Sequence, residues 1–215
     1  YDANAIPTRS QTTLSNPDLT WETTTQTDIG FDITVLGGRI NFSADYYYKR
    51  TKDMLMTATL PAGSAAARTL HYNGGEMENK GFEFTLGTRN LVGEFKWNTD
   101  LNISFNRNKL LSLKLTQVYY NATTNEYVNE PVVRNMPGKA LGTFWGYFAD
   151  GVDPETGELN YRDVNHDGII SASDRADIGD PNPDFTYGIT NTFSYKGFNL
   201  SVLIQGSYGN DIYNV

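Results

Sequence analysis

The sequence predicts an all-β protein, an antiparallel meander of about six strands that forms part of a large transmembrane β-barrel with long extracellular loops. Three observations predict this fold class. Apolar and polar residues alternate with a period of two in six separate runs. Short turns join these runs in pairs, whereas the connections between pairs are long. The chain has 14 Tyr and 11 Phe, and aromatic residues favour strands over helices.

The first predicted hairpin lies near the start of the chain. Residues 29–35 alternate between apolar and polar side chains, and the alternation resumes at residues 40–48. Gly37 and Gly38 between them are a strong tight-turn signal, because glycine adopts positive φ without strain. Residues 51–75 break the alternation and contain several turn-forming residues, so we expect a long loop there.

Two further hairpins follow the same pattern. They are predicted at residues 82–86 and 95–105 around a turn at 90–93, and at residues 185–193 and 198–208 around a turn at Lys196-Gly197. Between them, we expect residues 108–183 to form a very long extracellular insertion, with some helix or small strands such as 117–120 and 126–128.

The two faces of the predicted strands differ in polarity. One face is apolar and fits lipid, while the other carries Asp, Glu, Lys, Asn and Thr and fits a wet barrel interior. Runs of about 10 to 12 residues are long enough to cross a bilayer at a tilt. Aromatic residues gather near the predicted strand ends, as in interfacial girdles: Tyr46, Tyr47, Tyr48, Tyr195 and Phe198. A water-soluble β-sandwich gives the same alternation, but the asymmetry between short turns and long loops favours the membrane protein.

The composition excludes several function classes. A net charge of −8 argues against nucleic-acid binding, which needs clustered Lys and Arg. With no cysteine, the chain has no disulfide framework and no thiolate metal site. It also contains no nucleophile elbow, phosphate loop or zinc-protease motif, so we expect no enzymatic activity. Glu155 and Glu158 are spaced as a carboxylate pair, but their sequence indicates a solvated turn.

The segment from Asp163 to Asp174 matches an EF-hand-like calcium loop. Calcium binds about six to eight oxygen ligands, and a tight loop with glycine at position 6, here Gly168, turns alternate side chains inward. The predicted ligands are Asp163, Asn165, Asp167, the carbonyl of Ile169, Ser171 and Asp174. Position 12 departs from the motif, because Asp174 is shorter than the usual glutamate. The alternative is an Asp/Asn/Gly-rich turn held by its own side-chain hydrogen bonds.

Aromatic residues in the long insertion are candidates for contact with substrate or with a lid. Aromatic faces offer platforms for sugar rings, while internal packing of the folded loop is the simpler alternative. The candidates are Tyr119, Tyr120, Phe144, Trp145 and Tyr147.

Several motifs resemble the C-terminal barrel region of SusC/RagA-type TonB-dependent transporters of Bacteroidetes. They occur at residues 16–22 (NPDLTWE), 142–147 (GTFWGY), 153–158 (DPETGE), 163–174, 178–179 (IG), 181–188 (PNPDFTYG), 195–198 (YKGF), 205–206 (QG) and 209–214 (GNDIYN). The likeness covers nearly the whole chain and is strongest after residue 137.

This resemblance implies an outer-membrane location in a Gram-negative bacterium, surrounded by outer-membrane lipid. Such transporters are barrels of about 22 strands that enclose a plug domain. They import glycans or peptides, pair with a SusD-like surface lipoprotein and draw energy from TonB through their N-terminal region. On this view, residues 1–215 are a partial barrel domain, without the plug and the remaining strands.

Two alternative functions stay open at the level of sequence. A soluble, secreted calcium-binding β-domain, acting as an adhesin or interaction module, has the same alternation and the same loop. An extracellular carbohydrate-active enzyme domain is the weaker alternative, because no catalytic motif supports it.

Overall fold

The computed structural model describes residues 13–59, 69–114, 118–120 and 132–213, and in this part of the chain the main feature is one long antiparallel sheet. Six long strands build it: β2 (Thr23–Val35), β3 (Ile40–Thr59), β4 (Thr69–Val92), β5 (Phe95–Leu113), β12 (Phe185–Tyr195) and β13 (Phe198–Tyr208). Their spatial order is β13-β12-β5-β4-β3-β2, so each strand neighbours the next one in the chain. The predicted meander of three hairpins is confirmed.

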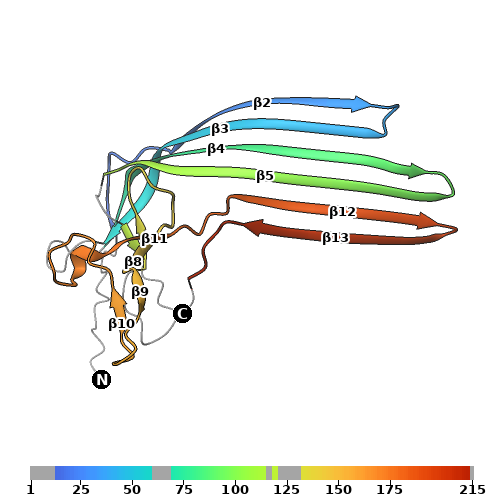
Figure 1. The fold of residues 1–215 in the computed structure, drawn as a ribbon. Helices are drawn as coiled ribbons and strands as arrows, with labels where there is room; N and C mark the ends of the chain where they lie inside the picture. The colour runs from blue at the N-terminus through green and yellow to red at the C-terminus, as the bar shows by residue number, and fades with distance from the viewer. Residues whose placement is uncertain (1–12, 60–68, 115–117, 121–131, 214–215) are drawn as a thin grey trace, which may run out of the picture.

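Shorter elements lie at one end of this sheet, away from the hairpin turns (Figure 1). A short strand, β1 (Thr13–Leu14), pairs in parallel with the start of β4. A four-stranded sheet contains β6 (Val118–Tyr120), β7 (Val133–Asn135), β8 (Phe144–Gly146) and β11 (Ala176–Gly179). A separate hairpin is formed by β9 (Ala149–Val152) and β10 (Leu159–Tyr161), and one turn of 3₁₀ helix, η1, spans Ala172–Asp174.

The hairpin turns are tight, as the sequence predicts. Between β2 and β3, Gly37 and Gly38 have φ values of 64° and 84°. Between β12 and β13, Lys196 and Gly197 both have positive φ, which is the geometry of a two-residue turn that follows the strand twist. The turn between β4 and β5 is shorter than predicted, because β4 continues to Val92 through an irregular register.

The predicted loop at residues 51–75 is wrong at both ends, and its middle, residues 60–68, lies outside the described residues. β3 continues to Thr59 and β4 begins at Thr69, and their pairing passes two irregularities around Met54. Bulges of this kind shift the side chains of a strand between faces while its backbone stays paired, so period-two alternation is lost although the strand is not. For the same reason β5 extends to Leu113, beyond the predicted start of the insertion at residue 108. The predicted strand at residues 126–128 lies outside the described residues.

One face of the sheet, here called the outer face, carries a continuous aromatic and aliphatic surface. The strand register places Tyr46 beside Phe82 and Phe82 beside Phe105, and the Phe105 ring packs against Phe185. At the turn end, Phe193 packs against both Phe95 and Trp97. From Phe95 to Phe105 the strand advances ten residues. At about 3.3 Å per residue and a tilt of about 40°, this distance spans about 25 Å, the height of the apolar band of outer-membrane barrels.

The opposite face, here called the inner face, is polar and contains close approaches at glycine. Gly81 lies between Tyr47 on β3 and Asn106 on β5 in the strand register. The Tyr47 hydroxyl crosses over Gly81 and donates a hydrogen bond of 2.9 Å to the Asn106 side chain. Three strands are thus tied together at a position where a Cβ atom would block the tyrosine.

The sheet has almost no interior of its own. Leu110 and Val132 are the only buried hydrophobic side chains among the described residues, while many large apolar side chains on the long strands are exposed. A single-layer wall exposes both faces, so this pattern is what a barrel segment requires and what a globular core does not show. No helix in the described part of the chain has the length and apolar character needed to span a membrane.

Candidate functional site

The small elements are attached to the end of the sheet by two asparagines. The Asn108 side chain accepts a hydrogen bond from the Leu141 backbone N–H at 2.7 Å and donates one to the Asn182 side chain at 2.8 Å. Asn182 in turn donates to the Leu141 carbonyl at 2.9 Å. The end of β5, the segment before β8 and the segment before β12 are therefore joined at one point, which we call the asparagine clamp.

Leu110 reinforces this attachment from β5. Its backbone N–H donates to the Lys139 carbonyl, and its carbonyl accepts from Gly138 N–H. The Leu110 side chain is 2% exposed, and Lys139 forms an ion pair of 2.5 Å with Asp177 on β11. The insertion is thus fixed on the rim of the wall by backbone pairing, burial and charge.

The three described aromatic candidates on and beside β8, here called the aromatic cluster, are half-buried, and each ring packs against a different partner. Phe144 packs against Tyr213 with ring centroids 5.9 Å apart, and Tyr147 packs against Tyr161 at 5.5 Å. The guanidinium carbon of Arg134 lies 4.0 Å from the centroid of the Trp145 ring. These contacts supply the internal packing that the sequence allowed as an alternative, and they leave part of each ring accessible.

The other two aromatic candidates, Tyr119 and Tyr120, are on β6. Their backbones pair with Arg134 and Val133 of β7, so they belong to the same four-stranded sheet as the cluster around β8. Their side chains lie outside the described residues.

The β9–β10 hairpin projects beyond this sheet and is exposed along its length. Arg162 closes its base, because its guanidinium is paired with the Asp150 carboxylate and lies over the Phe148 ring. The hydrogen bonds from Arg162 lower the pKa of Asp150 from its usual value. Glu155 and Glu158 lie in the exposed turn of this hairpin, as the sequence predicts.

The Asp163–Asp174 segment forms a closed loop held by alternating oxygen acceptors. The Asp163 carboxylate accepts from the backbone N–H groups of Asp167, at 3.2 Å, and Gly168, at 2.7 Å. The Asn165 side chain accepts from Asp167 N–H and donates to the Asp167 carboxylate, both at 2.9 Å. Gly168 has φ of 82°, which agrees with its predicted turn position. His166 is exposed, as expected for a position that supplies no ligand.

Asp174 is the centre of this loop. Its side chain is fully buried, and its carboxylate accepts from the backbone N–H groups of Ser171 at 2.7 Å and Val164 at 2.9 Å. Backbone donation, from Ser171 first, lowers the pKa of the Asp174 carboxyl, and the interaction with the Asp163 side chain lowers this pKa further. Two predicted calcium ligands are therefore adjacent. Among the described residues, however, no group of three or more His, Cys, Asp and Glu side chains is arranged to hold a metal ion.

Sequence reasoning missed the asparagine clamp. Asn108 falls where the period-two alternation of β5 ends, and Asn182 lies in a Pro-Asn-Pro segment that reads only as a turn signal. Neither residue carries local information about a partner more than 70 positions away. The insertion leaves the sheet at the end of β5 and returns at the start of β12, and these two strands are neighbours. The two ends of the insertion must therefore lie close together, and this was the one signal that could have indicated the contact.

The geometry defines the class of protein before any comparison is made. A single-layer antiparallel wall has an apolar outer face about 25 Å high, tight turns at one rim and a folded insertion at the other, which is the architecture of an outer-membrane β-barrel. Residues 2–214 match the family model described as TonB dependent receptor-like, beta-barrel. The chain belongs to this family, and its location is the outer membrane.

Individual relatives agree with this assignment. The chain is 38% identical over 94% of its length to TonB-dependent receptor P26 of Formosa agariphila, and 31% identical over 92% of its length to TonB-dependent receptor SusC of Bacteroides thetaiotaomicron. These matches cover 22% and 20% of the two relatives, so the chain spans about a fifth of their length. The solved structure of the RagAB peptide transporter superposes with a TM-score of 0.76 at 22% identity, over 92% of this chain and 22% of that one. The predicted SusC/RagA-type barrel is confirmed, and the soluble alternative is not supported.

Proposed function

We propose that the chain is a wall segment of an outer-membrane transporter that imports oligomeric nutrients, either glycans or peptides. The transporter works with a SusD-like lipoprotein at the cell surface and is driven by TonB. The observation that carries this proposal is the match of residues 2–214 to a receptor barrel family, together with an outer face of the height that lipid requires. The SusC relative and the RagAB fold support nutrient import as the task.

The segment contributes positioning rather than chemistry. The wall provides a lipid-facing outer surface and a polar inner surface, and the asparagine clamp fixes the folded insertion above the barrel mouth. A substrate passing this insertion encounters polar loops and half-buried rings, which suits oligomers with both hydroxyl or amide groups and apolar faces. No covalent step is assigned to any residue.

Uptake by cells tests this proposal with the full-length parent protein. Deletion of its gene should abolish uptake of one class in a panel of fluorescent oligosaccharides and oligopeptides, and the intact gene should restore it. Loss of the partner lipoprotein or of TonB should reduce the same uptake. If the deletion strain takes up every member of the panel at the wild-type rate, the transport proposal is wrong.

The Asp163–Asp174 loop is proposed to bind calcium. The spacing of the loop supports this, because the carboxylates of Asp163 and Asp174 are oxygen ligands of the kind that calcium binds at positions 1 and 12. The amide oxygen of Asn165 and the Ile169 carbonyl add uncharged oxygen ligands of the kind calcium accepts. The Asp167 carboxylate, which accepts a hydrogen bond from the Asn165 amide, becomes a ligand when it gives up that hydrogen bond and contacts the ion instead. Calcium then stabilises the loop and supplies no chemistry.

Terbium luminescence and calorimetry on the detergent-solubilised full-length protein test the calcium site. Calcium should bind saturably, and Asp174→Asn should weaken binding at least about tenfold, since one carboxylate ligand is lost. Glu158→Gln, an exposed acidic position outside the loop, is the matched control. Unchanged calcium affinity in Asp174→Asn would show that the loop is only a hydrogen-bonded turn.

The aromatic cluster is proposed to contact substrate or the lipoprotein lid. Arg134 covers one face of Trp145 and leaves the rest of the ring for a sugar or peptide group. Trp145→Ala should therefore raise the substrate concentration needed for half-maximal uptake without lowering the amount of folded protein. Trp21→Ala, at a residue that is 93% exposed and outside the insertion, is the control. Equal effects of the two substitutions would remove Trp145 from the substrate path.

A further inference from the structure

The outer face changes character abruptly at the rim that carries the insertion. The row that contains Tyr46, Phe82 and Phe105 is the last aromatic row. Two residues further along each strand, the strand register places Tyr48, Lys80 and Arg107 side by side. Since side chains two residues apart share a face, these residues point outward, as the aromatic row does.

The charged residues continue for two more rows. Arg50, Glu78 and Lys109 are cross-strand partners in the next row, and Lys52 and Glu76 follow. We call this set the outer basic cluster: Arg50, Lys52, Lys80, Arg107 and Lys109, with Glu76 and Glu78 among them. Five cations in so small an area are unusual for a chain whose net charge is −8.

Part of this positive charge is already neutralised. Arg50 forms an ion pair of 2.5 Å with Glu76, and Arg107 forms one of 2.5 Å with Asp184. Lys80 and Lys109 are exposed and, within the described part of the chain, make no ion pair. Their ammonium groups are therefore available to an external anion.

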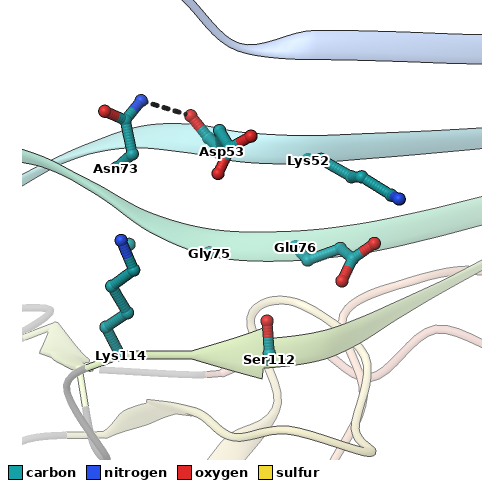
Figure 2. Close-up of a pocket in the computed structure, with 8 residues that line it drawn as sticks. Lys52, Asp53, Asn73, Gly75, Glu76, Ser112 and Lys114 are labelled. Carbon is teal, nitrogen blue, oxygen red and sulfur yellow. Dashed lines mark hydrogen bonds between the residues drawn. The ribbon is translucent and has the colours of Figure 1, made fainter. Parts of the chain in front are cut away.

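A polar pocket of about 160 Å³ adjoins the cluster on the side away from the aromatic row. Figure 2 shows Lys52 on β3, Glu76 on β4 and Ser112 on β5, with Lys114 just past the end of β5 and the Lys52 side chain pointing away from Lys114. Ser112 is the cross-strand partner of Glu76, so the pocket opens on the same face as the cluster. The Ser112 hydroxyl and the Lys114 ammonium line it as hydrogen-bond donors, but they lie seven or more residues beyond Phe105 and therefore further out than the lipid phosphates.

The position of the cluster identifies its ligand. Aromatic rows of a barrel lie at the boundary between hydrocarbon and headgroups, so residues one row beyond them lie at the depth of lipid phosphates. Among the described residues, the other rim of the outer face ends in Phe95, Trp97 and Phe198, the nearby Lys196 lies 3.6 Å from Glu94, and the Arg39 guanidinium donates to the carbonyls of Arg89 and Asn90. The exposed outer-face lysines that make no ion pair in the described part of the chain, Lys80 and Lys109, thus lie on the loop side.

We propose that the outer basic cluster binds the phosphate groups of anionic lipids in the outer leaflet of the outer membrane. Lys80 and Lys109, which lie within four residues of the last aromatic row, supply the free charges that bind these phosphates. Bound lipid fixes the tilt of the wall at the level of the last aromatic row. The inference rests on the outer-membrane location and is independent of the nutrient that is transported.

Lipid binding to the full-length parent protein tests the site. The protein is delipidated in neutral detergent and titrated with lipid A that carries phosphate and with the same lipid after dephosphorylation, and bound lipid is counted by native mass spectrometry. A lysine at a charged membrane surface contributes about 1 kcal/mol. Lys80→Gln with Lys109→Gln should therefore weaken binding of the phosphorylated lipid about thirtyfold, and should not change binding of the dephosphorylated lipid.

Lys49→Gln with Lys96→Gln is the matched control, because it removes the same charge from side chains on the inner face. Heat-modifiable gel mobility verifies that each variant is folded. If the lysine pair cannot be replaced without unfolding, the wild-type protein decides the question. Raising ionic strength from about 0.05 M to about 0.5 M should release phosphorylated lipid. Retention of lipid by the double variant or at high salt, or equal binding of both lipids, would overturn the proposal.

Discussion

The crossing of Tyr47 over Gly81 leads to a strong prediction about the stability of the wall. A Cβ atom at Gly81 would lie 2.6 Å from the Tyr47 hydroxyl oxygen and closer still to the Phe105 carbonyl. Gly81→Ala should therefore displace Tyr47 and break its hydrogen bond to Asn106, which contributes about 0.5–1.5 kcal/mol. Overpacking adds about 1–3 kcal/mol, and the lower backbone entropy of alanine in the unfolded chain offsets about 0.5–1 kcal/mol. The net cost should be about 2–3 kcal/mol.

Urea titration of the full-length protein folded into vesicles measures this cost. Gly93→Ala is the control, because a Cβ atom there meets nothing within 4 Å. A double-mutant cycle adds a second criterion. Since Gly81→Ala already breaks the tyrosine hydrogen bond, Tyr47→Phe should cost about 1 kcal/mol in the wild type and almost nothing in the Gly81→Ala background. Equal stability of the two alanine variants would refute the reasoning.

Three further predictions concern the insertion and the turn rim. Asn182→Ala breaks the asparagine clamp, so proteolysis of the insertion in the folded barrel should accelerate about tenfold or more, whereas the gel mobility of the barrel stays unchanged. Asn191→Ala removes the acceptor of both the Trp97 indole N–H, at 2.9 Å, and the Thr99 hydroxyl, at 2.7 Å, and should lower the unfolding free energy by about 1–3 kcal/mol in the same urea titration. The pKa of Asp150 is lower in the folded protein than its usual value, so the ionised carboxylate stabilises the β9–β10 hairpin at pH values above the usual carboxyl pKa. This stabilisation is lost as the pH falls through the folded-state pKa. Hydrogen exchange at Arg162 N–H should therefore accelerate in acid beyond its intrinsic rate, and Arg162→Gln should abolish this extra acceleration.

The long strands were predictable where lipid dictates their side chains. Ile29, Phe31 and Ile33 alternate with polar residues because one face meets hydrocarbon and the other meets water, and the sequence carries that difference directly. Beyond the membrane both faces meet water, so β3 and β4 stay paired around Met54 with no apolar alternation to reveal them. In this region each strand is held by hydrogen bonds to its neighbour, and the alternation within one strand contains no information about that neighbour.

The candidate site was predictable to a different degree in each part. The Asp163–Asp174 loop is local, and its turn at Gly168 and its inward acidic side chain at Asp174 follow from spacing alone. Calcium binding itself remains a prediction. The cover of Trp145 by Arg134 joins strands β8 and β7, and no spacing rule places a guanidinium over that ring. The outer basic cluster could have been predicted, because every second residue of a strand shares a face and the residues two positions beyond Phe82 and Phe105 are Lys80 and Arg107.

The change from aromatic to charged side chains along the outer face also locates the membrane boundary, and this gives a last prediction. If the hydrocarbon ends at the row of Phe105, a lysine introduced on the outer face should cost more as its position moves from this row to the middle of the apolar band. Leu101 shares the face and lies near the middle of the apolar band, so Leu101→Lys should cost about 2–4 kcal/mol, whereas Phe105→Lys should cost about 0–1 kcal/mol beyond the loss of its ring contacts. Leu101→Ala and Phe105→Ala correct for those lost contacts. Folding into vesicles measures all four variants. Equal lysine penalties at the two positions would place the boundary elsewhere, and the outer basic cluster would then no longer lie at the depth of the lipid phosphates.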